Sequence, residues 1–383
     1  MTTPQLRILG LTLERVADFR SQPSAKSAGL YAALDRRFEV VDVVRPALPK
    51  TEHYFNRLMT AHPDRSYWRS RSSLSTWAFH RRSIHAERLL QQSAGRYDLI
   101  VQLHTLVSPG LDPQKYRYVL HTDNTYMISE RHYPSWAPLR GQQREEWIRR
   151  ERMVYQNAAF LFPRSEFLRR SMIEDYGCDP QRVIRVGGGS NFGTASLTNK
   201  RYDSQIALFV GFDFERKGGM HLLQAWEQVH RQLPQAELWI VGPKRPSRQM
   251  PGVRWLGLTK DRQLLAQLYQ RATLFVMPSL FEPWGHVFFE AMGQGLACIG
   301  STVCAMPEII DDGVTGVLVP PGEPVPLASA LIELLGDANR AEVMGKAAQQ
   351  RVLQGSTWDD VVARMAPYIE QAVAENEQRA QAV

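Results

Sequence analysis

Short apolar runs alternate with longer amphipathic segments along almost the whole chain. Short runs bounded by glycine, proline or polar residues are typical of buried strands, whereas apolar residues at about every third or fourth position are typical of helices. The pattern predicts strands at residues 7–11, 38–44, 97–103, 116–120, 159–163, 182–186, 206–210, 237–241, 253–255 and 274–277. It predicts helices at 27–36, 142–157, 219–232, 262–271, 286–294, 326–335, 340–350 and 358–380, and one that begins after Ser165. Strands that alternate with helices favour an α/β fold with parallel, doubly wound sheets.

The chain is long enough for two domains. Its 383 residues exceed what a single hydrophobic core usually supports. Residues 191–204 are polar enough to form a linker. We therefore expect an N-terminal Rossmann-like domain at residues 1–200 and a C-terminal one at residues 201–383.

Composition narrows the class of protein. Hydrophobic residues make up 44% of the chain and charged residues 22%, as in ordinary globular proteins. Cys178, Cys298 and Cys304 show neither a pairing pattern nor the spacing of metal ligands. The N-terminus lacks the apolar core of a signal peptide, and no segment is apolar for long enough to span a bilayer. We expect a cytoplasmic protein that holds no metal.

The net charge of +7 is unevenly distributed. Residues 1–200 hold 30 Lys and Arg against 19 Asp and Glu, whereas residues 201–383 hold 16 against 20. This difference predicts an anionic partner for the first half. Residues 51–92 are rich in arginine, histidine and aromatic residues. They either pack as a helical insertion on the first domain, or lie on an anionic membrane at the inner face or on an acidic acceptor.

Residues 275–322 combine two kinds of chemistry. Glu282 and Glu290, with seven residues between them, bracket a turn that leads from a strand into a helix. Three amides at the start of this helix are expected to lack intrahelical acceptors, namely those of Gly285, His286 and Val287. Such amides and the helix dipole attract phosphate, whereas carboxylates accept hydrogen bonds from hydroxyls. The two together predict a nucleotide-sugar site.

This segment resembles the donor-site signature of family 4 retaining glycosyltransferases, which have the GT-B fold. The resemblance rests on the runs E-P-W-G-x-V-x-x-E-A-M and P-E-I-I-x-D-G-x-T-G-x-L-V-P-P-G. It covers nearly all of the second domain and, more loosely, the first domain from residue 97 onward.

The resemblance implies two Rossmann-like domains that face each other across a cleft. The first would bind the acceptor and the second a nucleotide-diphosphate sugar, which is a co-substrate, so no cofactor is implied. Transfer would retain the anomeric configuration. No Asp-x-Asp motif occurs, so a metal-dependent architecture is unsupported. The last helix, 358–380, would cross back onto the first domain.

The resemblance also implies roles for single residues. Arg216 and Lys217, in the loop after strand 206–210, would neutralise the donor diphosphate together with the amides at the start of the helix. Glu290 would bind the ribose hydroxyls and Glu282 the hydroxyls of the donor sugar. His121 matches the histidine that approaches the donor sugar in this family. His104, one strand before His121, is a rival for the histidine role.

The chain also departs from the family pattern at two places. Phe212 stands where the family usually has an arginine, and residues 24–29 replace a glycine pair near the donor phosphates. Lys26 either substitutes for that backbone contact or lies on a solvated helix start.

Two other classes of function remain open. One is a non-catalytic module that binds anionic lipid or nucleic acid through the basic first half, although the main interpretation expects no nucleic acid. The other is a GT-B phosphorylase or epimerase. The sequence leaves the base, the sugar, the acceptor and the oligomeric state undetermined.

Overall fold

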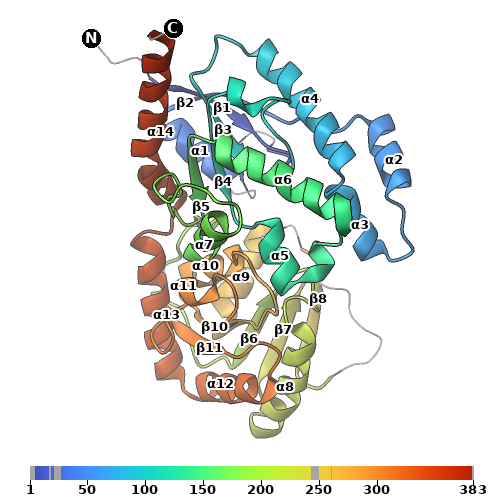
Figure 1. The fold of residues 1–383 in the computed structure, drawn as a ribbon. Coiled ribbons are helices and arrows are strands. Elements are labelled where there is room, and N and C mark those ends of the chain that lie inside the picture. The colour runs from blue at the N-terminus through green and yellow to red at the C-terminus, as the bar shows by residue number, and fades with distance from the viewer. Residues whose placement is uncertain (1–4, 17–18, 21–26, 243–249, 260, 382–383) are drawn as a thin grey trace. The chain divides into compact units, whose positions relative to one another are not determined.

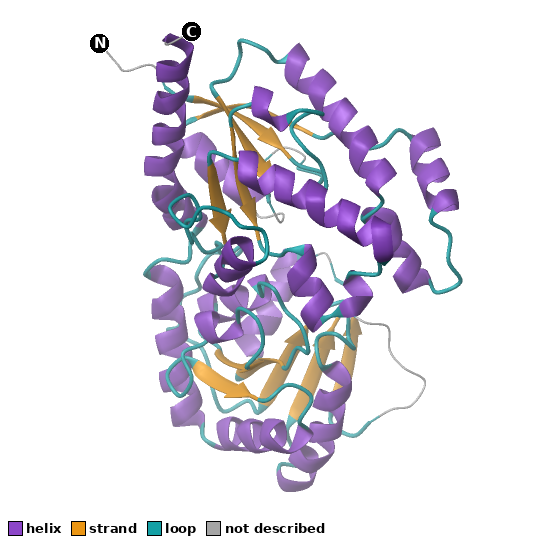
Figure 2. Ribbon diagram, viewed as in Figure 1, coloured by secondary structure: helices purple, strands orange, loops and turns teal. Residues whose placement is uncertain are grey.

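The computed structural model describes residues 5–16, 19–20, 27–242, 250–259 and 261–381. It divides into two compact units. Unit 1 comprises Met1–Gly187 together with Trp358–Val383, and unit 2 comprises Gly188–Thr357. In each unit a central sheet is covered by helices (Figures 1 and 2). In the described ranges, no helix is both long and apolar enough to cross a bilayer.

Unit 1 contains a five-stranded parallel sheet of order β2-β1-β3-β4-β5. Its strands are β1 (Arg7–Leu11), β2 (Glu39–Val44), β3 (Leu99–Leu103), β4 (Tyr118–Thr122) and β5 (Phe160–Pro163). Its helices are α1 (Ala28–Arg37), α2 (Lys50–Met59), α3 (Arg65–Ser73), α4 (Thr76–Gln92), α5 (Tyr126–His132), α6 (Gly141–Asn157), α7 (Glu166–Glu174) and α14 (Trp358–Gln381), with 3₁₀ turns η1 (Pro113–Lys115) and η2 (Pro134–Trp136).

The C-terminal helix α14 is part of the unit 1 core. Its buried side chains share one apolar cluster with α1 and the sheet, and they are Trp358, Val361, Val362, Met365, Ala366, Ile369 and Ala372. Figure 1 shows α14 beside α1, and α4 and α6 away from it on the other side of the sheet. Burying apolar side chains is the main favourable term in folding, so the last segment of the chain stabilises the first unit.

Unit 2 contains a six-stranded parallel sheet of order β11-β10-β9-β6-β7-β8. Its strands are β6 (Ile206–Val210), β7 (Glu237–Val241), β8 (Val253–Gly257), β9 (Leu274–Met277), β10 (Ala297–Ser301) and β11 (Gly316–Val319). Its helices are α8 (Gly219–Gln232), α9 (Arg262–Arg271), α10 (His286–Gly293), α11 (Met306–Ile309), α12 (Pro324–Gly336) and α13 (Ala338–Leu353). The central strands β9 and β10 are buried throughout, as expected for strands covered on both faces.

The polar segment 191–204 is not a free linker, and the expected boundary at residue 200 lies inside unit 2. The Lys200 ammonium donates to the carbonyls of Tyr269, Gln270 and Ala272 at 3.1–3.2 Å. The Tyr202 hydroxyl donates to the Gly295 carbonyl at 3.1 Å. These tertiary hydrogen bonds hold the segment on unit 2, although its composition is that of a loop.

Several predicted strands also differ in their bounds from those observed, and two of the differences change the description of the sheet in unit 1. Residues 182–186 form an isolated bridge at Val183 rather than a strand. Strand β4 ends at Thr122, beyond the predicted end at residue 120, because His121 pairs with Leu103 on one side and Phe162 on the other. His121 therefore lies inside the sheet rather than in the loop that follows it.

We predict that Met365→Ala, in α14, destabilises unit 1. Met365 is fully buried, and such a truncation typically costs about 2–5 kcal/mol. Urea unfolding should show this loss in the transition of unit 1. Met220→Ala, at a half-exposed position of α8, is the control and should have little effect. Equal effects of the two changes would contradict the assignment of α14 to the unit 1 core.

Candidate active site

Both sheets reverse their strand order at one point. In unit 2 the chain leaves β6 toward β7 and β8, whereas β9, β10 and β11 extend on the other side of β6. In unit 1 the reversal falls between β1 and β3. Ligands of open α/β sheets bind outside the carboxyl ends of the strands at such a point. We therefore expect ligand-binding side chains in the loops after β6 and β9 of unit 2 and in the loops after β1 and β3 of unit 1.

In unit 2 the loops after β6 and β9 are in close contact. The Leu280 amide donates to the Arg216 carbonyl at 2.8 Å. Gly218 precedes α8 with a φ of +74°, and a β-carbon there would collide with the Pro278 carbonyl. Only glycine adopts this conformation without strain while allowing so close an approach. The glycine thus fixes where the preceding residues, Arg216 and Lys217, point.

Arg216 and Lys217 both hold the carboxylate of Glu282. The Lys217 ammonium lies 2.9 Å from Glu282 Oε2, and Arg216 Nη1 lies 3.4 Å from the same oxygen. Arg216 also donates to the Phe281 carbonyl at 2.5 Å and pairs with Asp213 at 3.1 Å. We refer to Arg216, Lys217 and Glu282 as the Glu282 cluster. The side chains of all three are largely buried. Since buried charges are stable only when paired, the cluster fixes the geometry of both loops.

The stem of Lys217 lies across Gly211, where a β-carbon would collide with it. The Lys217 ammonium also lies 3.1 Å from the Met277 sulfur, at the end of β9. The side chain therefore spans the reversal point from β6 to β9. Its charge is placed where an anionic ligand of this sheet would lie.

Glu290 lies in α10 and is buried. The Tyr269 hydroxyl donates to its carboxylate at 3.3 Å. Burial raises the pKa of Glu290 to about 7, against the lowering effects of the nearby Arg262 charge and the Tyr269 hydrogen bond. Glu290 is thus a carboxylate that changes its protonation near neutral pH.

The start of α10 partly matches the predicted anion site. Within the described part of the chain, the amides of Gly285 and Val287 have no backbone acceptor. The His286 amide differs from the prediction, because it donates to the Trp284 carbonyl at 3.2 Å. The His286 ring is within 3.3 Å of the Gly189 carbonyl. Two of the three predicted amides thus remain available to a ligand.

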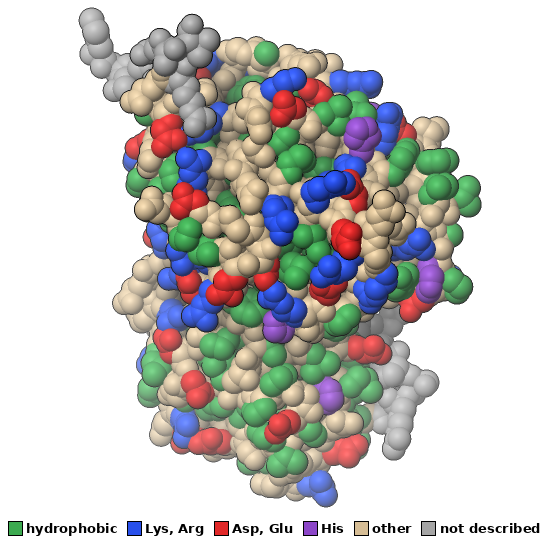
Figure 3. Space-filling view, viewed as in Figure 1, with side chains coloured by type: hydrophobic (Ala, Val, Ile, Leu, Met, Phe, Trp, Pro, Cys, Tyr) green, Lys and Arg blue, Asp and Glu red, His purple; other side chains and the backbone are tan. Residues whose placement is uncertain are grey.

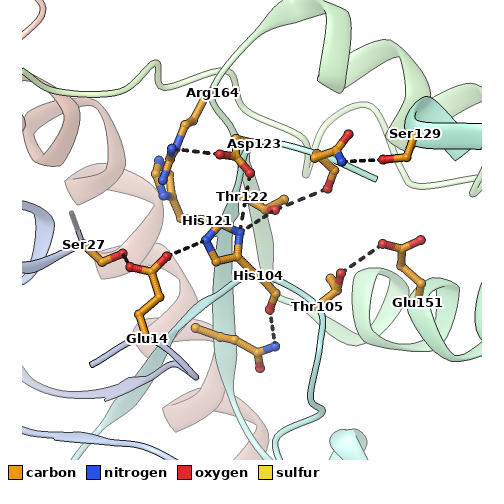
Figure 4. Close-up of polar contacts among 12 residues, drawn as sticks. Glu14, Ser27, His104, Thr105, His121, Thr122, Asp123, Ser129, Glu151 and Arg164 are labelled. Carbon is orange, nitrogen blue, oxygen red and sulfur yellow. Dashed lines mark hydrogen bonds and ion pairs between the residues drawn. The ribbon is translucent and has the colours of Figure 1, made fainter. Parts of the chain in front are cut away.

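In unit 1 a second polar cluster surrounds His104, directly after β3 (Figure 4). Its ring nitrogens lie 3.4 Å from Glu14, which follows β1, and 3.6 Å from Asp123, which follows β4. Asp123 pairs with the buried Arg164 at 3.1 Å. His104 has a φ of +60°, which is unfavourable for a residue with a β-carbon and is typical of functional sites.

His121 is fully buried, which the prediction of a strand end had not anticipated. Its Nε2 is 3.4 Å from the Gly187 carbonyl, and its ring packs against Trp358. Burial, and next the charge of Arg164, lower the pKa of His121 well below 6.5, so the ring is neutral at pH 7. In the described structure Nδ1 has no hydrogen-bond partner. Figure 4 shows His121 next to Arg164.

A buried glutamate holds the loops around His104. Glu151 accepts hydrogen bonds from the Thr105 hydroxyl at 3.0 Å, the Tyr126 amide at 3.1 Å and the Tyr155 hydroxyl at 3.1 Å, and another from the Tyr176 hydroxyl. Burial raises the pKa of Glu151 above its usual 4.5. Four donors satisfy this carboxylate, so it fixes the loop after β3 and the start of α5.

Several residues of the two clusters were not predicted from the sequence. Asp213 lies three residues before Arg216, and its position after a strand could have indicated it. Glu14, Arg164 and Glu151 gave no local signal, because their partners are distant in the chain. Lys26 lies outside the described residues.

Comparison with known proteins relates unit 2 to glycosyltransferases. Residues 204–337 match the family model described as Glycosyl transferases group 1. Alpha-maltose-1-phosphate synthase of Mycobacterium tuberculosis is 30% identical over 256 residues, which are 57% of this chain and 64% of that protein. D-inositol 3-phosphate glycosyltransferase of Corynebacterium diphtheriae is 26% identical over 247 residues, which are 57% of this chain and 58% of that protein. The matches span less than two thirds of these relatives.

Solved structures share the fold over nearly the whole chain. Sucrose-phosphate synthase from Thermosynechococcus elongatus has a TM-score of 0.68 and 19% identity, covering 96% of this chain and all of that one. HepE of Anabaena in complex with UDP has a TM-score of 0.63 and 17% identity, with the same coverage. These similarities confirm the predicted GT-B fold. The segment that contains Arg216, Lys217, Glu282 and Glu290 is the segment that matches group 1 glycosyltransferases.

We predict that the buried His121 makes the protein less stable in acid. Because its pKa is lower in the folded state than the unfolded value of 6.5, the unfolded chain binds more protons below about pH 6.5, and stability falls as pH falls. His121→Gln should reduce this slope by up to about 1.4 kcal/mol per pH unit, measured by urea unfolding at several pH values. The exposed His53→Gln serves as the control and should keep the wild-type slope. An unchanged slope in His121→Gln would contradict the prediction.

Proposed function

We propose that this protein is a retaining glycosyltransferase of the family 4 type, which moves a sugar from a nucleotide-diphosphate donor to a hydroxyl of an acceptor. The main support is the Glu282 cluster, which lies at the reversal point of unit 2 and within the segment that matches group 1 glycosyltransferases. Cations for a diphosphate and carboxylates for hydroxyls are the two functions that a sugar nucleotide requires.

Lys217 is assigned to the donor diphosphate. Its ammonium is held only by single contacts with Glu282 and Met277 among the described residues, so it has further donors for phosphate oxygens. The amides of Gly285 and Val287 would add two neutral donors. Stabilising the charge of the departing diphosphate is the largest contribution expected in such a transfer.

Arg216 acts mainly by positioning Glu282. Its guanidinium is 7% exposed and already bonds Asp213, the Phe281 carbonyl and Glu282. Glu282 has a second carboxylate oxygen, and we assign it to hydroxyls of the donor sugar near the reacting carbon. Glu290 is assigned to the ribose hydroxyls, with Tyr269 fixing its orientation.

The reaction exchanges one bond to the anomeric carbon for another. The bond to the diphosphate oxygen breaks as the bond to the acceptor oxygen forms on the same face. The proton of the acceptor hydroxyl passes to the oxygen of the departing phosphate. No step in this scheme requires a metal, because Lys217 and the amides compensate the negative charge. Turnover in excess chelator would test that independence.

The acceptor is assigned to unit 1. Glu14, His104 and Asp123 offer acceptors and a donor for hydroxyl groups, and His104 is partly exposed. Glu151 positions this loop. His121 is buried beside this cluster, and in the described structure its Nδ1 has no hydrogen-bond partner. The strained backbone of His104 supports a functional role for the loop.

UDP-glucose is the first donor to test, because the similar HepE structures are complexes with UDP and UDP-glucose. Release of UDP from UDP-glucose by the purified chain, with water as acceptor, would separate an enzyme from a binding module. Glu282→Gln should abolish it. The anomer of the released glucose, recorded early by NMR, should be α. If UDP raises the melting temperature but no donor is turned over, the protein binds nucleotides without catalysis.

We predict that Lys217→Met weakens UDP binding much more than uridine binding. A hydrogen bond to a charged group contributes about 1.5–3 kcal/mol, so the UDP dissociation constant should rise about 10- to 150-fold. Calorimetric titration of both ligands measures the effect. Lys346→Met, at an exposed position of α13, is the matched control. Equal UDP affinities of wild type and Lys217→Met would exclude Lys217 from the diphosphate site.

We predict that UDP affinity depends on the protonation of Glu290. Its pKa is raised to about 7, so the carboxylate is ionised above that pH and accepts hydrogen bonds from both ribose hydroxyls. Affinity should therefore rise by up to about tenfold between about pH 6 and about pH 8. Glu290→Gln should lose this dependence. The ratio of the wild-type UDP affinity to that of Glu290→Gln at each pH is the quantity to compare, because the titration of UDP itself cancels in it. A constant ratio across the range would disprove the assignment.

A further inference from the structure

Helix α2 in unit 1 has its polar and apolar faces reversed relative to an ordinary surface helix. Its only buried residue is Asn56. Four large apolar side chains are exposed instead, namely Tyr54 (68%), Phe55 (47%), Leu58 (74%) and Met59 (66%). We refer to these four as the α2 stripe. Surface helices normally turn such side chains toward the core.

The stripe is continuous along the helix. Tyr54 and Leu58 are one turn apart, and so are Phe55 and Met59, so the four side chains cover one face. Lys50 and Arg57 lie one turn before and after Tyr54, along the edge of this face. Both are exposed. An exposed apolar face with cations along its edge is the arrangement of helices that lie in a membrane interface.

Contacts outside the α2 stripe fix the helix in this orientation. The Asn56 amide donates to the Ser72 carbonyl and hydroxyl, each at 2.9 Å. The Trp68 indole donates to the Arg57 carbonyl at 2.9 Å, and the Arg57 guanidinium lies 4.3 Å from the Trp68 ring centre. Because these polar contacts anchor α2 to α3, the exposed stripe is a property of the folded unit.

The charge around the stripe favours an anionic surface. Residues 50–82 contain seven Lys and Arg but only two acidic residues, Glu52 and Asp64. Glu52 pairs with Arg81 and His85, and Asp64 caps α3. The Glu52 pair neutralises Arg81 in turn, so this pair neither attracts nor opposes an anionic partner, and the six other cations still outnumber Asp64. Figure 3 shows hydrophobic and basic side chains together on the part of unit 1 over α2 and α3.

We propose that α2 docks unit 1 on an anionic lipid bilayer, with the α2 stripe in the interface and Lys50 and Arg57 at the lipid phosphates. A second copy of the chain fits less well, because pairing two stripes would bring like charges together. The bilayer provides both an apolar layer and negative charge. Docking would operate whether or not unit 2 binds a sugar nucleotide.

Co-sedimentation of the full chain with lipid vesicles tests this assignment. Wild type should sediment with phosphatidylcholine–phosphatidylglycerol vesicles and much less with phosphatidylcholine alone, and added salt should weaken binding. Leu58→Ser/Met59→Ser should reduce the partition coefficient at least about tenfold. The matched control is Val325→Ser/Val343→Ser, which changes two exposed side chains of unit 2 (64% and 68%) and should bind as wild type does.

Further measurements separate the alternatives. Lipids brominated in their acyl chains should quench tryptophan fluorescence of wild type, because Trp77 lies 5.1 Å from Phe55 in ring-centre distance; the Leu58/Met59 variant should be quenched less. Unchanged melting temperature and UDP release would show that the variant is folded and that its defect is in docking. Equal vesicle binding by wild type and the Leu58/Met59 variant would overturn the proposal. The proposal would also be overturned if wild type did not bind the vesicles. It would be overturned as well if wild type were a dimer, and the Leu58/Met59 variant were a monomer that still bound vesicles.

Discussion

The candidate active site depends on one carboxylate, Glu282, that two cations from another loop hold in place. Arg216 and Lys217 follow β6 and Glu282 follows β9, so the ion pairs connect the two loops where the strand order of unit 2 reverses. Removing one partner of such a buried pair leaves an uncompensated charge, which is strongly destabilising. The pairing thus sets the positions of Arg216, Lys217 and Glu282 relative to one another.

The two units use the same structural principle for different chemistry. Each gathers polar side chains at the carboxyl ends of the strands beside the reversal of its sheet. Unit 2 presents a lysine and helix amides suited to phosphate, whereas unit 1 presents Glu14, His104 and Asp123, which are suited to hydroxyls. In unit 1 the hydrogen bonds to Glu151 hold the loop after β3 and the start of α5, and the Asp123–Arg164 ion pair adds to this support. The strain at His104 is retained because that network and the flanking carboxylates hold the residue in place.

Most of the secondary structure was predictable because the apolar pattern directly reflects which face of each element is buried. Strand β6 and helix α9 have the predicted bounds, and Ser165 caps α7 through the Leu168 amide as its residue type suggests. The errors arose where long-range pairing overrides local composition. Strand β4 is extended by its neighbours β3 and β5, and residues 182–186 find only a single bridge. For residues 51–92 the composition left two interpretations, and the apolar exposure of α2 became known only from its tertiary contacts.

The sequence by itself determined the α/β class, and it placed Glu282, Glu290, Arg216 and Lys217 in segments that run from a strand through a turn to a helix start. These depend on residue types at short spacing, which a strand, a turn and a helix start bring together locally. Only the tertiary structure decided that both cations bind the same Glu282 oxygen, that His121 is buried while His104 is partly exposed, and that Glu14 reaches His104. Those facts depend on which strands are neighbours in each sheet and which side chains pack over them. That order is set by the burial of the whole apolar core, which no single stretch of the chain encodes.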